Sequence, residues 1–213
     1  MKIKVCGLRD KTNLKELTAL PLDYMGFIFY SKSVRYVGDD FDEEITKMIP
    51  SHIRKVGVFV NEAAEKILTL AKKYQLDAIQ LHGDESLEDC QKIKDSGLEV
   101  FKAFQVNESF QFKSLDTYQS ACDYFLFDTK SDAYGGSGKK FDWRILENYK
   151  GETPFFLSGG IGIEDIEAVN AFQHSKLFSL DVNSGFEQSP AVKNVVLVKE
   201  FLKSVRQTKD EQK

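Results

Sequence analysis

Eight short apolar segments recur along this chain of 213 residues. Each has the length of a β-strand and is rich in Val, Ile, Phe or Tyr. The segments are Lys2–Cys6, Tyr24–Phe29, Lys55–Val60, Ala78–His82, Glu99–Phe104, Asp123–Asp128, Pro154–Ser158 and Leu177–Asp181. Most of the intervening stretches can form an amphipathic helix, and strands that alternate with helices indicate a parallel sheet. Eight such units predict an α/β protein with a closed (β/α)8 fold, the TIM barrel.

Helix signals occur between several of these strands. Asn61–Tyr74 begins with a residue suited to an N-cap and has apolar residues at spacings of three and four. Ser86 and Gly97 are suited to begin and end another helix. We also predict helices over Asp10–Ala19, Ile163–Phe172 and Ala191–Val205, with a weaker helical pattern over Glu108–Ala121.

The length of the chain is near the lower limit for this fold, which predicts one domain with short connections. We assign residues 1–205 to the barrel and residues 206–213 to a polar C-terminal tail that frays. Two loops are longer than the others, Tyr30–Asp40 after the second strand and Thr129–Lys140 after the sixth. Long loops at the mouth of a barrel are usually lids or binding loops, and we expect the same here.

Composition excludes several classes of partner. The chain has 29 Lys and Arg against 33 Asp and Glu, a net charge of −4 without a long basic block, which argues against nucleic-acid binding. No apolar run approaches the roughly 20 residues of a membrane span, so we predict no membrane partner. The first residues enter a strand directly, which leaves no room for a signal peptide.

Cysteine and histidine usage predicts neither disulfides nor a metal site. The three cysteines are Cys6, Cys90 and Cys122, and no Cys-x-x-Cys pair is present. An odd number of cysteines without such a pair fits a reducing, cytoplasmic location. The three histidines are also widely separated in the sequence, so no histidine cluster supports a metal site.

The active site of a (β/α)8 barrel lies where the strands end, so residues that end several strands are expected to meet. Two glycine-containing segments follow the seventh and eighth strands, Gly159-Gly160 and Ser184-Gly185. Glycines allow backbone N–H groups to approach a phosphate closely, and the loops after these two strands are the usual phosphate site of the fold. The alternative is that these glycines only form tight turns.

Cys6 ends the first strand and Asp128 ends the sixth, on different sides of the predicted mouth. A thiol and a carboxyl group on two sides of a small substrate can serve as base and acid. Taken singly, Cys6 could instead be a small buried apolar residue and Asp128 could cap a turn. Cys90 and Cys122 lie in helical stretches, and we predict that both belong to the core.

Two further polar residues lie near strand ends. Arg35 belongs to the loop after the second strand, where its planar guanidinium could bind a carboxylate, although it could also be a solvated surface charge. His82 ends the fourth strand and could donate a hydrogen bond to substrate or have a purely structural role.

Together these segments resemble the phosphoribosylanthranilate isomerase family, (β/α)8 enzymes of tryptophan biosynthesis. The matching motifs, in chain order, are Lys4-Val-Cys-Gly, Gly26-Phe-Ile-Phe, Ser33-Val-Arg35, Val56-Gly-Val-Phe-Val, Gln80-Leu-His-Gly, Asp128, Gly135-Gly-Ser-Gly-Lys-Lys-Phe-Asp-Trp, Leu157-Ser-Gly-Gly-Ile and Asp181-Val-Asn-Ser-Gly-Phe-Glu187. They cover nearly the whole chain, and the ordered set is highly specific.

The resemblance implies an Amadori rearrangement of N-(5-phosphoribosyl)anthranilate to 1-(2-carboxyphenylamino)-1-deoxyribulose 5-phosphate, without a cofactor. It implies that Cys6 is the general base and Asp128 the general acid. Arg35 is then expected to contact the anthranilate, and the two glycine loops the phosphate. His82 and Asp181 are further candidates for substrate binding. This chemistry requires a cysteine with a lowered pKa and an aspartic acid with a raised pKa.

Two positions depart from the family pattern. Val34 stands where the family commonly has Pro, and Asn183 stands where the first Ser of the last motif is usual. The aldose–ketose isomerase of histidine biosynthesis is the nearest alternative enzyme, but it is expected to use two aspartates, whereas Cys6 ends the first strand here. An inert phosphate-binding barrel is a second alternative. The sequence leaves open whether the chain is a monomer or a homodimer.

Overall fold

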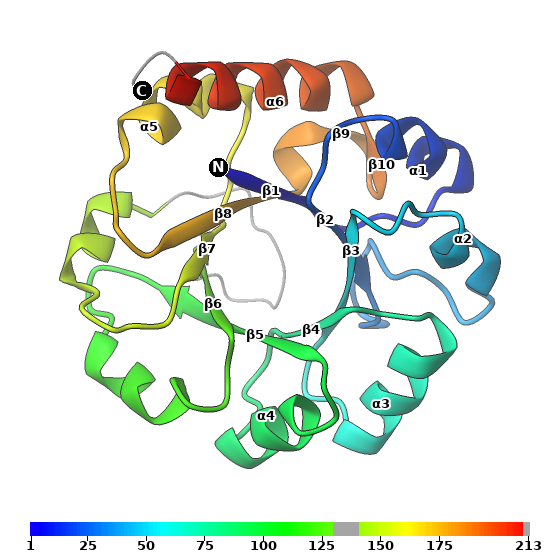
Figure 1. The fold of residues 1–213 in the computed structure, drawn as a ribbon, viewed down its shortest axis with the longest axis horizontal. Coiled ribbons are helices and arrows are strands. Elements are labelled where there is room, and N and C mark those ends of the chain that lie inside the picture. The colour runs from blue at the N-terminus through cyan, green and yellow to red at the C-terminus, as the bar shows by residue number, and fades with distance from the viewer. Residues whose placement is uncertain (130–140, 211–213) are drawn as a thin grey trace.

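Eight parallel strands form a closed barrel in the computed structural model, which describes residues 1–129 and 141–210 (Figure 1). The strands are β1 Lys2–Val5, β2 Tyr24–Ile28, β3 Arg54–Phe59, β4 Ala78–Leu81, β5 Glu99–Val106, β6 Tyr124–Thr129, β7 Phe155–Leu157 and β8 Leu177–Val182. Each strand pairs with the next in the sequence, and β8 pairs with β1 to close the ring. The predicted single-domain (β/α)8 fold is therefore confirmed.

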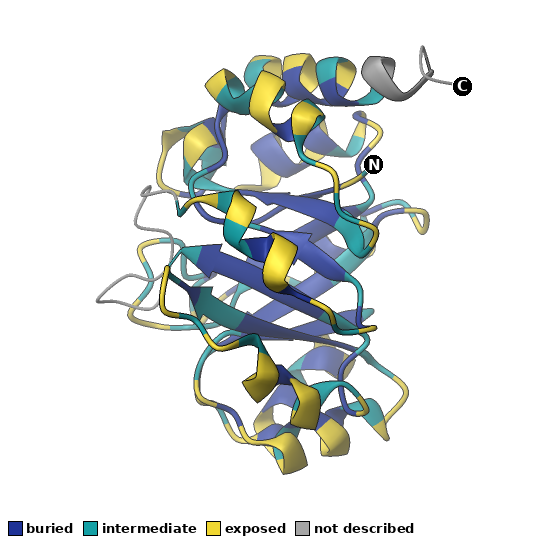
Figure 2. Cartoon of the chain, turned by 90° about the vertical axis from the view of Figure 1, so that its left-hand side faces the viewer, coloured by how far each residue is buried: buried dark blue, intermediate teal, exposed yellow. Residues whose placement is uncertain are grey.

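Helices surround the barrel and cover its outer face (Figure 1). The α-helices are α1 Lys11–Thr18, α2 Glu43–Lys47, α3 Ala64–Lys73, α4 Leu87–Lys94, α5 Ile166–Ala171 and α6 Val195–Asp210. The short 3-10 helices are η1 Phe112–Tyr118, η2 Trp143–Asn148, η3 Ile163–Asp165 and η4 Ser184–Phe186. A small hairpin follows β8 and consists of β9 Glu187–Ser189 and β10 Val192–Lys193. Figure 2 shows buried strands enclosed by helices whose outer faces are exposed.

The predicted helix boundaries are confirmed where capping side chains determine them. The side chain of Asp10 accepts a hydrogen bond from the Asn13 N–H at the start of α1. Ser86 forms a capping box with Asp89 at the start of α4, and Gly97 adopts a φ of +87° just after its end. These are the features that satisfy free backbone groups at helix ends.

Other boundaries differ from the prediction because of tertiary contacts. Asn61 does not cap α3, which begins at Ala64; its φ is +50°, and its side-chain oxygen accepts a hydrogen bond from the Asp84 N–H. The segment from Ala191 first enters β10, so α6 begins only at Val195.

The ends of two other predicted segments also differ. The weak helical pattern over Glu108–Ala121 corresponds to the 3-10 helix η1. Helix α6 continues through residues 206–210, which belong to the predicted tail, whereas residues 211–213 lie outside the described residues. In the described part of the chain, no helix is both long and apolar enough to cross a membrane.

The interior of the barrel changes character along its axis. Near the amino ends of the strands, the rings of Tyr24, Phe101 and Phe156 pack with centroid distances of 4.7–5.8 Å. Side chains two residues apart on a strand face the same way. Along β4 the buried interior residue Ala78 is therefore followed by Gln80, which lies nearer the mouth. The aromatic cluster is an apolar floor beneath a polar mouth.

We predict that Phe101→Ala lowers the free energy of unfolding by about 3–5 kcal/mol, because it leaves a cavity in this floor. Phe101 is fully buried, whereas Val196 on α6 is 73% exposed. Val196→Ala is therefore a control that should change the free energy by less than about 0.5 kcal/mol. Urea denaturation of both variants checks the prediction, and equal effects would contradict the role of the floor.

Candidate active site

A pocket opens at the carboxyl ends of the strands and is lined by residues from most of them. All nine residues predicted from the sequence line it: Cys6, Arg35, His82, Asp128, Gly159, Gly160, Asp181, Ser184 and Gly185. Residues separated by up to 179 positions in the chain are thus brought together around one cavity. The loop Tyr30–Asp40 contributes Tyr30 and Ser33 as well as Arg35.

Cys6 follows β1 and is almost fully buried at one side of the pocket. Its N–H donates to the carbonyl of Val182, which continues the pairing of β1 with β8. The neighbouring strand has Gly26 at this level, where a Cβ atom would lie 2.7 Å from the Cys6 sulfur. Gly26 therefore provides the space that the thiol occupies.

Burial raises the pKa of the Cys6 thiol, and the nearby ammonium groups of Lys4 and Lys193 oppose this shift. The chemistry implied by the sequence requires a lowered pKa, so the structure differs from that expectation. The cause is desolvation, because burial destabilises the thiolate by more than the two cations stabilise it.

Lys4 is a fully buried lysine in the barrel interior, which the sequence analysis did not identify as a site residue. Its Nζ lies 3.0 Å from both carboxylate oxygens of Asp181 and 2.7 Å from the Oε1 of Gln80. Burial lowers the pKa of Lys4, but Asp181 and Cys6 outweigh this effect and raise it above the usual value. The available sequence signal was a lysine two residues before Cys6, and hence on the same face of an apolar strand.

Asp128, near the end of β6, lies across the pocket from Cys6. Its Oδ1 accepts a hydrogen bond of 2.8 Å from the Thr129 N–H, and its Oδ2 lies 3.3 Å from the Nε2 of His82. A glycine is needed at position 159, beside Asp128. A Cβ atom on Gly159 would lie 2.4 Å from the Thr129 hydroxyl, and the φ of Gly159 is +96°. The carboxyl group is thus held between β4 and β7.

Arg35 forms a bidentate ion pair with Glu187, another residue that the sequence analysis missed. Its Nε and Nη2 donate to the two carboxylate oxygens over 2.8 and 2.7 Å. The same carboxylate accepts a bond from Lys193, whose Nζ also donates to the Asn183 side chain. Burial opposes the charge on Glu187, but Arg35 and Lys193 together hold its pKa below the usual range.

The two departures from the family pattern have different surroundings. Val34 is exposed on the loop between β2 and α2. The side chain of Asn183, in contrast, is fixed by Lys193 and approaches Gly7, where a Cβ atom would lie 2.7 Å from its oxygen. Asn183 is therefore part of the charged network beside Cys6.

The two glycine loops are adjacent at the mouth. A Cβ atom on Gly185 would lie 2.4 Å from the carbonyl oxygen of Ile161, so only a glycine allows the loops after β7 and β8 to approach this closely. Gly159 and Gly160 both adopt positive φ values, +96° and +73°. Such backbone conformations favour glycine and turn successive N–H groups toward one point.

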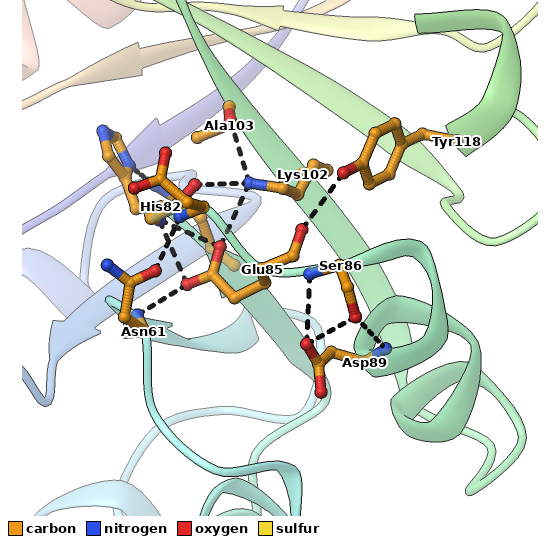
Figure 3. Close-up of polar contacts among 11 residues, drawn as sticks. Asn61, His82, Glu85, Ser86, Asp89, Lys102, Ala103 and Tyr118 are labelled. Carbon is orange, nitrogen blue, oxygen red and sulfur yellow. Dashed lines mark hydrogen bonds and ion pairs between the residues drawn. The ribbon is translucent and has the colours of Figure 1, made fainter.

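A buried ion pair next to the pocket was also missed by the sequence analysis. The side chains of Glu85 and Lys102 are 1% and 3% exposed and lie 3.0 Å apart (Figure 3). Glu85 accepts hydrogen bonds from the N–H groups of Asn61 and Gly83, and Lys102 donates to the carbonyl of Gly83. This pair connects the loops after β3 and β4 and so fixes the backbone that follows His82.

Several other predictions can be compared with the structure. Cys90 and Cys122 belong to the hydrophobic core, as predicted, and all three cysteines are free. Residues 130–140, with most of the motif that begins at Gly135, lie outside the described residues. Lid movement stays a prediction for both long loops. Within residues 1–129 and 141–210, no group of three His, Cys, Asp or Glu could hold a metal ion.

We predict that Lys102→Met destabilises the fold by about 3–5 kcal/mol, because it leaves the Glu85 carboxylate buried without its cation. The double variant Lys102→Met/Glu85→Gln should recover more than half of this loss, since no charge then remains buried. Chemical denaturation of both single variants and the double variant measures the coupling. Additive losses would show that the two side chains do not act as a pair.

Comparison with known proteins agrees with this architecture. A family model for N-(5'phosphoribosyl)anthranilate (PRA) isomerase matches residues 3–204. The chain is 45% identical to the N-(5'-phosphoribosyl)anthranilate isomerase of Parabacteroides distasonis over 206 residues, 96% of this chain and 93% of the relative. It is 42% identical to the enzyme of Phocaeicola vulgatus over 97% of this chain and 98% of that protein.

Solved structures show the same similarity. The crystal structure of phosphoribosyl anthranilate isomerase from Thermotoga maritima superposes with a TM-score of 0.86 at 37% identity, over 97% of this chain and 99% of that chain. A phosphoribosyl anthranilate isomerase in complex with reduced 1-(o-carboxyphenylamino)-1-deoxyribulose 5-phosphate superposes with a TM-score of 0.83 at 33% identity, over 97% and 99% of the two chains. The resemblance found in the sequence is confirmed: this chain belongs to the N-(5'-phosphoribosyl)anthranilate isomerase family, the isomerases of tryptophan biosynthesis.

Proposed function

We propose that this pocket carries out the Amadori rearrangement of the family with Asp128 as general acid and Cys6 as general base. The observation that supports these roles best is the position of the two residues. They line one pocket from β1 and β6, next to the two glycine loops. A solved relative with a phosphorylated deoxyribulose compound bound supports a small phosphorylated substrate.

Asp128 acts first in the proposed sequence. Its carboxylic acid donates a proton to the ring oxygen of the ribose, the bond between C1 and that oxygen breaks, and the nitrogen lone pair forms a protonated imine at C1. The positive imine makes the proton on C2 acidic. General acid catalysis of this kind requires the carboxyl group to lie within hydrogen-bond reach of the oxygen in the bound state.

Cys6 acts second, as the thiolate. It removes the C2 proton, the electrons of that bond form an enolamine, and tautomerisation to the ketone at C2 completes the reaction. The electrons of both steps come from the substrate, so no cofactor takes part. The ammonium group of Lys4, which lowers the pKa of Cys6 against the effect of burial, favours the thiolate.

The anthranilate is proposed to bind at Arg35. Its Nε and Nη2 already hold Glu187 in a bidentate pair, which fixes the plane of the guanidinium. The Nη1 group lies on the other edge of this plane and can donate to the anthranilate carboxylate. His82 and Asp181 line the same pocket and are proposed to contact the ribose chain.

The phosphate is proposed to bind to backbone N–H groups of Gly159-Gly160 and Ser184-Gly185. These loops are adjacent and contain positive φ values at Gly159 and Gly160, which suits them to hold an anion. We further propose a cytoplasmic monomer or homodimer, since one solved relative, from Thermotoga maritima, is described as a dimeric enzyme. Light scattering of the purified chain distinguishes the two states.

We predict that Cys6→Ala and Asp128→Asn each lower kcat by about 10²–10⁴-fold, because each removes a proton-transfer group. KM and the melting temperature should change little, since neither variant alters the size of the pocket substantially. Stopped-flow or steady-state fluorescence of phosphoribosylanthranilate consumption measures the effect. Near-normal kcat in either variant would remove that residue from the proposed mechanism.

We also predict that the Cys6 thiolate forms as pH rises through the range in which thiols ionise, above about pH 8.5. Burial raises the pKa of Cys6, so the reactive thiolate is a minor species at neutral pH and increases as pH rises. Absorbance at 240 nm, taken as wild type minus Cys6→Ala, reports the thiolate directly. A thiolate already fully formed at pH 7 would contradict the prediction.

A further inference from the structure

Gln80 is a buried polar residue of β4 to which the proposed mechanism gives no role. It is 1% exposed and lies in the barrel interior between Lys4 and His82. Its side-chain amide makes two short contacts. The Oε1 lies 2.7 Å from the Nζ of Lys4, and the Nε2 lies 2.7 Å from the Nδ1 of His82.

The orientation of this amide is determined by Lys4. An ammonium group has three donors and no acceptor, so the atom of Gln80 that faces it must be the carbonyl oxygen. The reverse orientation would place the amide NH2 against the charged donor of Lys4. The NH2 group therefore faces the imidazole of His82, and the contact between Lys4 and Asp181 keeps the ammonium in place.

The amide in turn determines where the proton of His82 lies. Because Gln80 donates to Nδ1, this nitrogen accepts, and the proton of a neutral ring is at Nε2. The Nε2 atom is buried and lies 3.3 Å from the Oδ2 of Asp128. The two are not aligned for a hydrogen bond, and Nε2 has no other partner in the part of the chain that the structure describes. His82 lines the pocket, so this N–H lies on the side of the pocket that contains Asp128.

We propose that Gln80 is a positioning residue that holds His82 in its Nε2–H tautomer, so that the imidazole presents a donor and not a lone pair beside Asp128. The inference rests on the proposed role of Asp128 as general acid. In the other tautomer, a lone pair 3.3 Å from the acid would compete for its proton, because imidazole is a stronger base than a carboxylate. The Nε2–H can instead donate to a substrate oxygen that Asp128 protonates.

Charged groups from three other strands lie near His82. Asp128 on β6 and Asp181 on β8 carry carboxyl groups toward the ring, and Lys4 on β1 carries the opposing charge. The amide NH2 of Gln80 occupies the lone pair of Nδ1, so a proton on that nitrogen would leave two donors facing each other.

The tautomer can be measured directly by the ¹⁵N chemical shifts of the histidine rings at pH 8. The chain has three histidines, and the resonances that disappear in His82→Gln identify the ring in question. We expect an unprotonated Nδ1 and a protonated Nε2 in the wild type. In Gln80→Glu, the carboxylate accepts from Nδ1–H, so the ring should reverse its tautomer or gain a second proton. A wild-type ring with Nδ1–H, or an unchanged ring in Gln80→Glu, would overturn the inference.

Kinetics give the second readout. Gln80→Glu should lower kcat by about 10- to 100-fold with KM within about threefold of the wild type, because the substrate still binds but the donor is lost. Gln80→Met, which is uncharged and similar in size, should lower kcat less, since it leaves both tautomers accessible. Gln91→Glu, which makes the same charge change on the exposed face of α4, is the control and should retain full kcat.

The outcomes separate this inference from the proposed function. If Asp128→Asn retained activity, the acid assignment would fail while the measured tautomer of His82 remained valid. If Asp128→Asn were inactive and both Gln80 variants kept wild-type kcat, the acid would stand and the role of Gln80 would be refuted. Thermal melting of each variant shows whether a loss of activity is a loss of fold. If Gln80→Glu does not fold, the ¹⁵N chemical shifts of the His82 ring in Gln80→Met still test the inference.

Discussion

The buried ammonium group of Lys4 is the constraint on which the mouth of this barrel depends. A charge without water is stable only if it is paired and hydrogen-bonded, so β8 must provide Asp181 and β4 must provide Gln80. The Lys4–Asp181 pair spans the seam where β1 meets β8 and the barrel closes. Cys6 lies next to the same cation. One interaction therefore connects the closure of the fold, the charge state of the proposed base and the orientation of the Gln80 amide.

Much of this arrangement could be predicted from the sequence, for a physical reason. Parallel strands joined by crossover helices all end on one side, so a residue at the end of an apolar run is placed at the mouth without further information. This rule alone brought Cys6, Asp128 and Asp181 to one pocket. The glycine pairs after β7 and β8 were recognisable because close backbone approach and positive φ values exclude most other residues.

The remainder depends on contacts between distant parts of the chain. Arg35 and Glu187 are 152 positions apart, and no local pattern shows that one will hold the other. Asn61 has the composition of a helix cap, but its contact with the loop after β4 draws it away from α3. The direction of the Cys6 pKa depends on how completely the thiol is buried, which is a property of the folded barrel. Burial and pairing of charges are therefore what the structure adds.

The apolar floor has a consequence for how such a protein can change during evolution. Ala78, Gln80 and His82 follow one another on the same face of a single strand and its extension, at intervals of about 7 Å. The first belongs to the aromatic floor, the second to a buried polar layer, and the third to the pocket wall. Because the packing is carried by this floor and by the larger core that includes strand and helix residues, substitutions at the rim can be tried by selection without dismantling the core. A barrel of this kind can acquire a new specificity while its stability is inherited unchanged.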